Sequence, residues 1–347
     1  MTPPLLRVSD LAVHFPLRRS RPFAAPRAVR AVDGIGFEIT AGRTFGLVGE
    51  SGSGKTTTAL AVMRLVEPTR GRIELGGTDL ARLSGAALRP LRRRFQMIFQ
   101  DPFSSLNPRA TAGAIVREPL DLMAVGTPHG RADRVAELFE AVGLRPEQQQ
   151  LFPHQFSGGQ RQRIGIARAL ATRPDLVVCD EPVSALDVAI RAQILNLLVR
   201  LQRDYRLAYL FISHDLGVVQ YMCDDIAVMY LGRIVELTDR ASLFRQPLHP
   251  YTWALLSAVP GAVGKDASAR QRIRLAGDPP SAIEPAAGCG FASRCPFAQP
   301  RCRSERPELR AVAAGGRVAC HLVDDSGRGP HQTPPRPALE LSDTRNR

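Results

Sequence analysis

The sequence has only two lysines, Lys55 and Lys265, although 46 of its 347 residues are basic and its net charge is +13. Nearly all of this charge is therefore arginine. Its densest runs, residues 18–21 and 92–94, contain no aromatic residues on which nucleic-acid bases could stack. This pattern argues against a nucleic-acid partner. It favours a solvated surface that is attracted to anionic lipid headgroups beside a membrane complex.

Long apolar runs are also absent. No stretch of 18 apolar residues could span a bilayer, and residues 1–4 lack the basic and then apolar pattern of an export signal. We therefore expect a chain that is made in the cytosol and meets a membrane only through partners. Six cysteines in such a chain argue against disulfides and leave metal binding open.

A complete phosphate-loop motif, G-x-x-x-x-G-K-T, occupies residues 49–56. The apolar run 44–48 predicts a strand before it, and residues 57–66 predict a helix after it. Such a loop turns consecutive backbone N–H groups toward a phosphate, and the helix N-terminus adds positive dipole. This context favours a nucleoside-triphosphate site over an ordinary glycine-rich turn. The residues expected to bind ATP here are Gly49, Glu50, Ser51, Gly52, Ser53, Gly54, Lys55, Thr56 and Thr57.

Within that loop, Lys55 is expected to reach the β- and γ-phosphates and the Thr56 hydroxyl to ligate Mg²⁺. A second candidate lies far downstream. The apolar strand predicted at 176–181 ends in Asp180 and Glu181. We expect Asp180 to hold the Mg²⁺ shell and Glu181 to orient and deprotonate the attacking water.

A second anion site is predicted where a serine and two glycines open another helix, at Ser157, Gly158, Gly159 and Gln160. One chain rarely needs two phosphate cradles for one nucleotide. Two chains that face each other head to tail do need both, because each then closes the other's site.

These motifs, together with residues 184–187 and 213–215, resemble the ATP-binding subunit of an ABC transporter. The resemblance implies an α/β fold with a RecA-like P-loop core, an antiparallel β subdomain and a helical subdomain. It also implies roles for single positions. Gln100, after the strand predicted at 95–99, senses Mg²⁺ and the γ-phosphate, and His214 contacts the γ-phosphate. Asp187 ends a loop that crosses the dimer interface, and Ser157 to Gly159 contact the nucleotide of the opposite subunit. Phe15 stacks on adenine, with a core aromatic as the alternative.

Residues 246–260, 100–108 and 181–187 resemble more narrowly the ATP-binding subunits of oligopeptide and dipeptide importers. The resemblance covers residues 5–325. It implies a cassette at 5–246 with a helical subdomain at about 103–171, and an extension at 247–325. The Pro- and Arg-rich stretch 16–30 is expected to be a surface loop, and the polar tail 326–347 to be disordered.

The function that this resemblance implies is that of an ATP-hydrolysing motor. It is expected to work at the cytoplasmic face of the inner membrane with ATP and Mg²⁺. Its partners are then a second ATPase subunit, identical or a sister, two transmembrane permease subunits and an extracytoplasmic solute-binding protein. Relatives of this subfamily also serve nickel, glutathione and other small solutes, so the solute stays open. A soluble ABC ATPase acting on nucleic acid or ribosomes is the alternative in another class. That class usually has two cassettes or an inserted coiled coil, and neither is present in this chain.

Four cysteines lie inside the extension with the spacing C-x5-C-x6-C-x17-C, at Cys289, Cys295, Cys302 and Cys320. Four soft thiolates in a short stretch can form a metal cage without a large core. The set lacks the C-x2-C pair of most structural zinc sites, so zinc is the second choice. Relatives with the same cysteines suggest a [4Fe–4S] cluster, while four metal-free thiols remain an alternative. His321 could replace one ligand.

Overall fold

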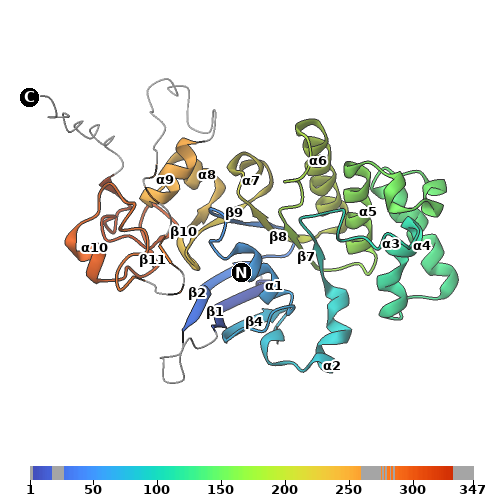
Figure 1. Ribbon diagram of the computed structural model, residues 1–347, viewed down its shortest axis with the longest axis horizontal. Helices are drawn as coiled ribbons and strands as arrows, with labels where there is room; N and C mark the ends of the chain where they lie inside the picture. Colours follow the sequence, from blue (N-terminus) through green and yellow to red (C-terminus); the bar gives the residue numbers. More distant parts are fainter. Residues whose placement is uncertain are drawn as a thin grey trace, which may run out of the picture.

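The computed structural model describes residues 3–17, 27–258, 275, 277, 280–281, 283 and 286–330, and these residues form two β-sheets with helices around them. The helices of the predicted helical subdomain lie at one end of the molecule, and the segment after residue 286 lies at the other (Figure 1). The ATP-binding motifs lie between them. No helix in the described part of the chain is long and apolar enough to cross a bilayer.

The smaller sheet is antiparallel. Its order is β2 (Ala28–Ile39), β1 (Leu6–Pro16), β4 (Arg70–Leu75) and β5 (Thr78–Asp79). This sheet is the antiparallel β subdomain that the family resemblance implies, and its two long strands β1 and β2 have 11 and 12 residues. These strands also reach into both ends of the loop predicted at 16–30, and residues 18–26 of that loop lie outside the described residues.

The larger sheet has the order β11-β12-β10-β9-β3-β8-β7-β6. Its parallel strands are β3 (Thr44–Val48), β6 (Phe95–Ile98), β7 (Leu176–Asp180), β8 (Ala208–Ser213) and β9 (Asp225–Tyr230). Every residue of β3, β7 and β8 is buried, as continuous apolar runs predict. Since the carboxyl ends of parallel strands share one edge, the segments after β3, β6, β7 and β8 all meet there.

The chain turns at Gly232 into a hairpin, with β10 (Arg233–Asp239) antiparallel to β9. Helices α1 (Lys55–Val62), α6 (Val188–Tyr205) and α7 (Leu216–Met222) follow the strands of the larger sheet. The shorter elements are α2 (Gly85–Leu88), α8 (Arg240–Arg245) and the 3₁₀ segments Leu80–Arg82, Arg89–Arg94, Pro146–Gln150 and Pro153–Gln155.

The helical subdomain consists of α3 (Ala112–Leu122), α4 (Pro128–Ala141) and α5 (Gly158–Leu170). The apolar residues on one face of α4 and one face of α5 are buried in one core that also includes β7 and α6 side chains. They are Val135, Leu138, Phe139 and Val142 in and just after α4, and Ile164, Ala167 and Leu170 on α5.

The extension continues the larger sheet and is not a separate unit on a tether. Its strand β12 (Arg317–Val318) pairs with β10 and with β11 (Arg310–Ala311). Its helix α9 (Pro250–Ser257) is anchored by Glu236 of β10. That carboxylate accepts hydrogen bonds from the backbone N–H groups of Leu248 and His249, both at 2.8 Å. Burial raises the pKa of Glu236 to about 7.

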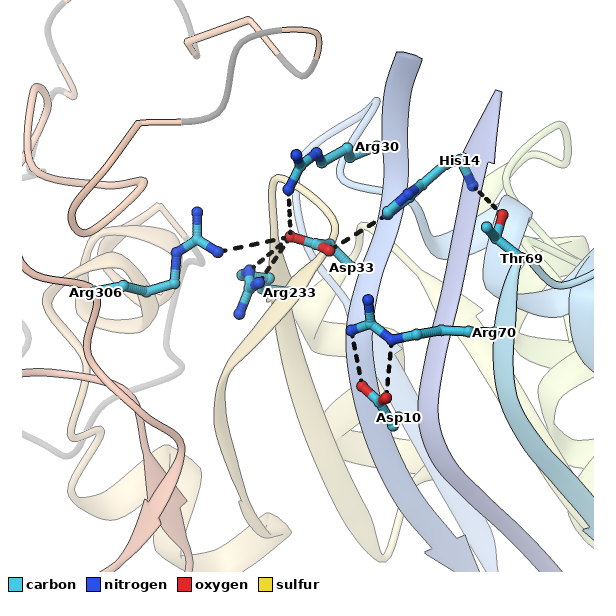
Figure 2. A network of polar contacts seen from close by, with 8 residues as sticks. All are labelled: Asp10, His14, Arg30, Asp33, Thr69, Arg70, Arg233 and Arg306. Atoms are coloured by element: carbon cyan, nitrogen blue, oxygen red, sulfur yellow. Dashed lines mark hydrogen bonds and ion pairs between the residues drawn. The ribbon is translucent and has the colours of Figure 1, made fainter. Parts of the chain in front are cut away.

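A second contact between the extension and the cassette involves Asp33 of β2 (Figure 2). Arg233 of β10 lies 2.7 Å from its carboxylate, and Arg306, which follows α10 (Pro300–Ser304), lies 3.8 Å from it. His14 of β1 reaches the other carboxylate oxygen at 3.3 Å. One buried carboxylate therefore joins both sheets to the extension.

Defined structure extends past the predicted end of the extension. The backbone of Arg328 and the side chain of Ser326 both donate to the Asp324 carboxylate, which closes a turn. Residues 326–330 of the tail predicted to be disordered are among the described residues, and residues 331–347 lie outside them.

Candidate nucleotide-binding site

The phosphate loop joins β3 to α1 as predicted. At two of its positions, neighbouring backbone atoms leave no room for a side chain, so only glycine fits. Gly54, the residue before α1, has φ +102°, and a Cβ there would lie 2.1 Å from the carbonyl oxygen of Ala31. A Cβ at Gly49 would lie 2.2 Å from the carbonyl oxygen of Met229. The loop is therefore held tightly between β2 and β9, and no side chain fits at either position.

Lys55 bends back over this loop. Its Nζ donates to the carbonyl oxygens of Gly49 and Glu50, both at 2.9 Å, and only 5% of the residue is exposed. Burial lowers the pKa of Lys55, while the nearby carboxylates of Glu181, Asp180 and Glu50 oppose that shift. The ammonium group therefore lies inside the loop, where a bound triphosphate would meet it.

Glu181 lies at the centre of a short chain of polar contacts after β7. Its two carboxylate oxygens lie 3.2 Å from Gln100 Nε2 and 3.1 Å from His214 Nδ1. Its backbone adopts φ +46°, a conformation that costs energy in a non-glycine residue, and its N–H donates to the carbonyl of Ile212. The three residues predicted to act on the γ-phosphate are thus brought together from three different loops.

Magnesium fits the neighbouring donor set. The Thr56 hydroxyl donates to the Asp180 carboxylate at 3.1 Å, so the two predicted oxygen ligands lie side by side at the end of the loop. Burial raises the pKa of Asp180, and the hydrogen bond from Thr56 opposes it. Hydroxyl and carboxylate oxygens are hard ligands of the kind that Mg²⁺ binds together with substrate phosphates.

A cavity of about 620 Å³ opens over this loop. Gln100, Glu181 and His214 line it, together with most residues of the phosphate loop, Thr57 included. Sequence reasoning missed Val29, Ala31, Leu216 and Leu255, which also line it. Phe15 is not among the lining residues, but it pairs with Val29 across β1 and β2 and is 42% exposed, so it lies beside the cavity rather than in the core.

The second predicted anion site has the expected local geometry. Ser157 caps α5 by accepting from the Gln160 N–H at 3.3 Å, and the Gln160 side chain accepts from the Ser157 N–H at 3.0 Å. Gly159 packs against Ile190 of α6, where a Cβ would lie 2.5 Å from Cγ2. Asp187 caps α6 through the Ile190 N–H. Neither cap lines the cavity over the phosphate loop of its own chain.

The four cysteines of the extension come together, although the structure gives the cluster prediction no support. All four line one small cavity, which His249, Phe291 and His321 also line. No group of three or more histidine, cysteine, aspartate or glutamate side chains in the described ranges is arranged to hold a metal ion. Burial raises the pKa of Cys289, of Cys295 to about 12 and of Cys320 to about 11. Cys179 and Cys223 are buried in the cassette, away from this set.

Two models of known families match separate parts of the chain. A model of the ABC transporter family matches residues 32–184, and a model described as the C-terminal region of oligopeptide/dipeptide transporters matches residues 235–302. The first match contains the phosphate loop and Asp180. The second contains α9 and three of the four clustered cysteines.

Among individual proteins, the chain is similar to the oligopeptide transport ATP-binding protein AppF of Bacillus subtilis (strain 168). The two are 48% identical over 319 residues, which cover 92% of this chain and 97% of AppF. It is 49% identical to the probable peptide ABC transporter ATP-binding protein y4tS of Sinorhizobium fredii, over 93% of this chain and 91% of the relative. Among solved structures, the dimeric ATP-binding cassette MJ0796 bound to ADP and Pi has a TM-score of 0.60 and 26% identity. It matches 68% of this chain and 98% of that cassette.

Proposed function

Since this chain belongs to the ATP-binding subunits of oligopeptide-type ABC transporters, we propose that it hydrolyses ATP to drive the import of peptides. One observation supports this most strongly. Glu181 lies at the cavity over the phosphate loop, with Gln100 and His214 on its two carboxylate oxygens. That is the position from which a general base can orient and deprotonate a water molecule beside a γ-phosphate.

The arrangement also supports a dimer as the active form. The Ser157 cap and the two glycine amides that follow it do not face their own chain's cavity, so they are free to meet the nucleotide of a second ATPase subunit. ATP then joins the two subunits, and hydrolysis separates them. The remaining partners in this proposal are two transmembrane permease subunits and an extracytoplasmic solute-binding protein. The chain is peripheral at the cytoplasmic face of the inner membrane.

The test is to purify the chain with its membrane partners, identify the co-purifying proteins and reconstitute the complex in proteoliposomes. We expect ATP hydrolysis to rise, and a labelled short peptide to be transported, when peptide-loaded solute-binding protein is added. Stimulation by nickel or glutathione in place of peptide would assign a different solute. Co-purification of ribosomes or nucleic acid without permease subunits would reject the importer.

For the extension, we propose that Cys289, Cys295, Cys302 and Cys320 are ligands of a [4Fe–4S] cluster. The support is chemical. Four thiols without disulfides line one cavity, and the backbone N–H of Cys289 donates to the carbonyl of Cys302 at 2.8 Å, which joins two of the three cysteine-bearing segments. Thiolates are the ligands that such clusters use. Burial raises the pKa of Cys289, Cys295 and Cys320, and a bound metal cation would favour the thiolate form that such a cluster needs.

Protein purified without oxygen is therefore expected to be brown, with broad absorption near ~400 nm and about four irons per chain. The Cys302→Ser variant should lose the colour and destabilise the extension more than it slows ATP hydrolysis. Cys179→Ser, a cysteine of the cassette core, is the control that should keep the colour. One zinc per chain would reassign the site to zinc. Protein that contains no metal would mean that the four cysteines are metal-free thiols and would reject the cluster.

A further inference from the structure

Glu50, the second residue of the phosphate loop, is held by two residues of the extension. Arg294 donates to both of its carboxylate oxygens, through Nη1 at 2.8 Å and Nη2 at 3.2 Å. The Tyr251 hydroxyl of α9 accepts a hydrogen bond from the Glu50 backbone N–H at 2.9 Å. Since the Glu50 carbonyl accepts from Lys55, every polar group of this residue has a defined partner.

Arg294 is well placed for a firm contact. Its side chain is only 8% exposed, against 29% for Glu50, and its guanidinium also lies 3.4 Å from the Tyr230 hydroxyl. The bidentate ion pair raises the pKa of Arg294 further above its usual value. A bidentate pair that is shielded from water is held much more firmly than an exposed one.

The segment that carries Arg294 is itself rigidly seated on the cassette. Phe291, three residues earlier, is 1% exposed, and its ring centre lies 5.4 Å from those of Tyr230 and Tyr251. Tyr230 and Tyr251 pack edge to face at 4.7 Å. Two turns fix the backbone between Cys289 and Cys295. The Ala292 N–H donates to the carbonyl oxygen of Cys289, and the Arg294 N–H donates to the carbonyl oxygen of Phe291. Arg294 therefore has little freedom to leave Glu50.

We infer that Arg294 is a positioning residue for ATP binding: it holds Glu50 away from the triphosphate and neutralises its charge. Glu50 lines the nucleotide cavity, where the triphosphate would bring several negative charges. A free carboxylate at that point repels the nucleotide and competes for Lys55, which lies within electrostatic reach of Glu50. The inference rests on the proposed ATPase function and gives the extension a part in the nucleotide site.

The test is a double-mutant cycle on Glu50 and Arg294, read by titration with a fluorescent ATP analogue. Arg294→Gln leaves an unpaired carboxylate and is expected to weaken ATP binding about tenfold. Glu50→Gln/Arg294→Gln replaces the ion pair by two amides and is expected to return to within about threefold of wild type, since such replacements are often tolerated. In the reconstituted complex, the KM of Arg294→Gln should rise with its loss of affinity, while its kcat at saturating ATP stays within about twofold.

Arg301→Gln is the matched control. It breaks another bidentate arginine–glutamate pair of the extension, with Glu305 at 2.6 Å, which is exposed and whose hydrogen bonds among the described residues stay within the extension. ATP affinity should not change in that variant. If folded Arg294→Gln bound ATP as wild type does, or if the double variant were as weak as the single one, the inference would be wrong. If Arg294→Gln does not fold, the ATP affinity of the double variant still tests the inference, because a folded double variant with much weaker ATP binding would contradict it. Failure of wild-type protein to bind ATP would instead reject the proposed function.

Discussion

Replacing Glu181 by Gln is expected to slow ATP hydrolysis by at least about 10²-fold while ATP still binds. The amide keeps the size of the side chain and its contact with Gln100, but it cannot accept a proton from water. Because the phosphate loop and the Ser157 cap are unchanged, ATP should remain bound between two subunits. The closed dimer should then accumulate, which size-exclusion chromatography of the purified chain with ATP can detect.

The control for this variant is Glu67→Gln, which changes a carboxylate that is 86% exposed and pairs with Arg64, just after α1. Its turnover should stay near wild type. Steady-state hydrolysis by Glu181→Gln near the wild-type rate would remove Glu181 from the role of general base. His214, 3.1 Å from the same carboxylate, would then be the next residue to test.

The Lys55→Ala variant should lose ATP affinity by about 10²-fold, because the side chain supplies a charged hydrogen-bond donor within a cluster of negative groups. Asp180 and Glu181 both act on Lys55 electrostatically, so its removal leaves these two carboxylates near the triphosphate without that counter-charge. The deficit should appear as loss of binding in a titration with a fluorescent ATP analogue. Neither hydrolysis nor dimer closure should be detectable at ordinary ATP concentrations.

Leu65→Ala serves as the comparison, since Leu65 follows the same helix, is 50% exposed and makes no contact with the loop cavity. Thermal unfolding of both variants shows whether the fold is kept. Wild-type affinity in Lys55→Ala would mean that the loop amides alone bind the nucleotide. The ammonium group would then only brace the carbonyls of Gly49 and Glu50.

The sequence predicted best those parts of the site that lie within one short segment. The loop from Gly49 to Thr56 and the carboxylates after β7 have the expected places, because a buried apolar strand followed by polar residues locates a sheet edge without any long-range information. The convergence of Gln100, Glu181 and His214 followed from the resemblance to a family. The contacts of Gln100 and His214 with Glu181 depend on the parallel strand order, which the spacing of these residues does not contain.

Contacts between distant segments were not predictable. Leu255 lines the nucleotide cavity although it lies in the extension, and nothing in its apolar surroundings distinguishes it from an ordinary core residue. The sequence did not predict the strands β4 and β5. Both are short, and β4 mixes arginine and glutamate with apolar residues, so it has no apolar run that would mark a strand. Arg294 is one of many arginines in a basic chain, so nothing in the sequence distinguished it as the residue that binds Glu50 of the phosphate loop.

The distance along the chain between Glu50 and Arg294 has a consequence for synthesis. They are separated by 244 positions, and a ribosome adds about 5–20 residues per second, so Arg294 is made about 12–50 s after the loop that it holds. During that interval the emerging chain contains the glycines and Lys55 but lacks Arg294, and for most of the interval it also lacks Tyr251. The nucleotide pocket of a growing chain therefore reaches its final form only near the end of translation. A ribosome that stalls before residue 294 leaves a cassette whose sheets can fold but whose loop still has an unpaired carboxylate.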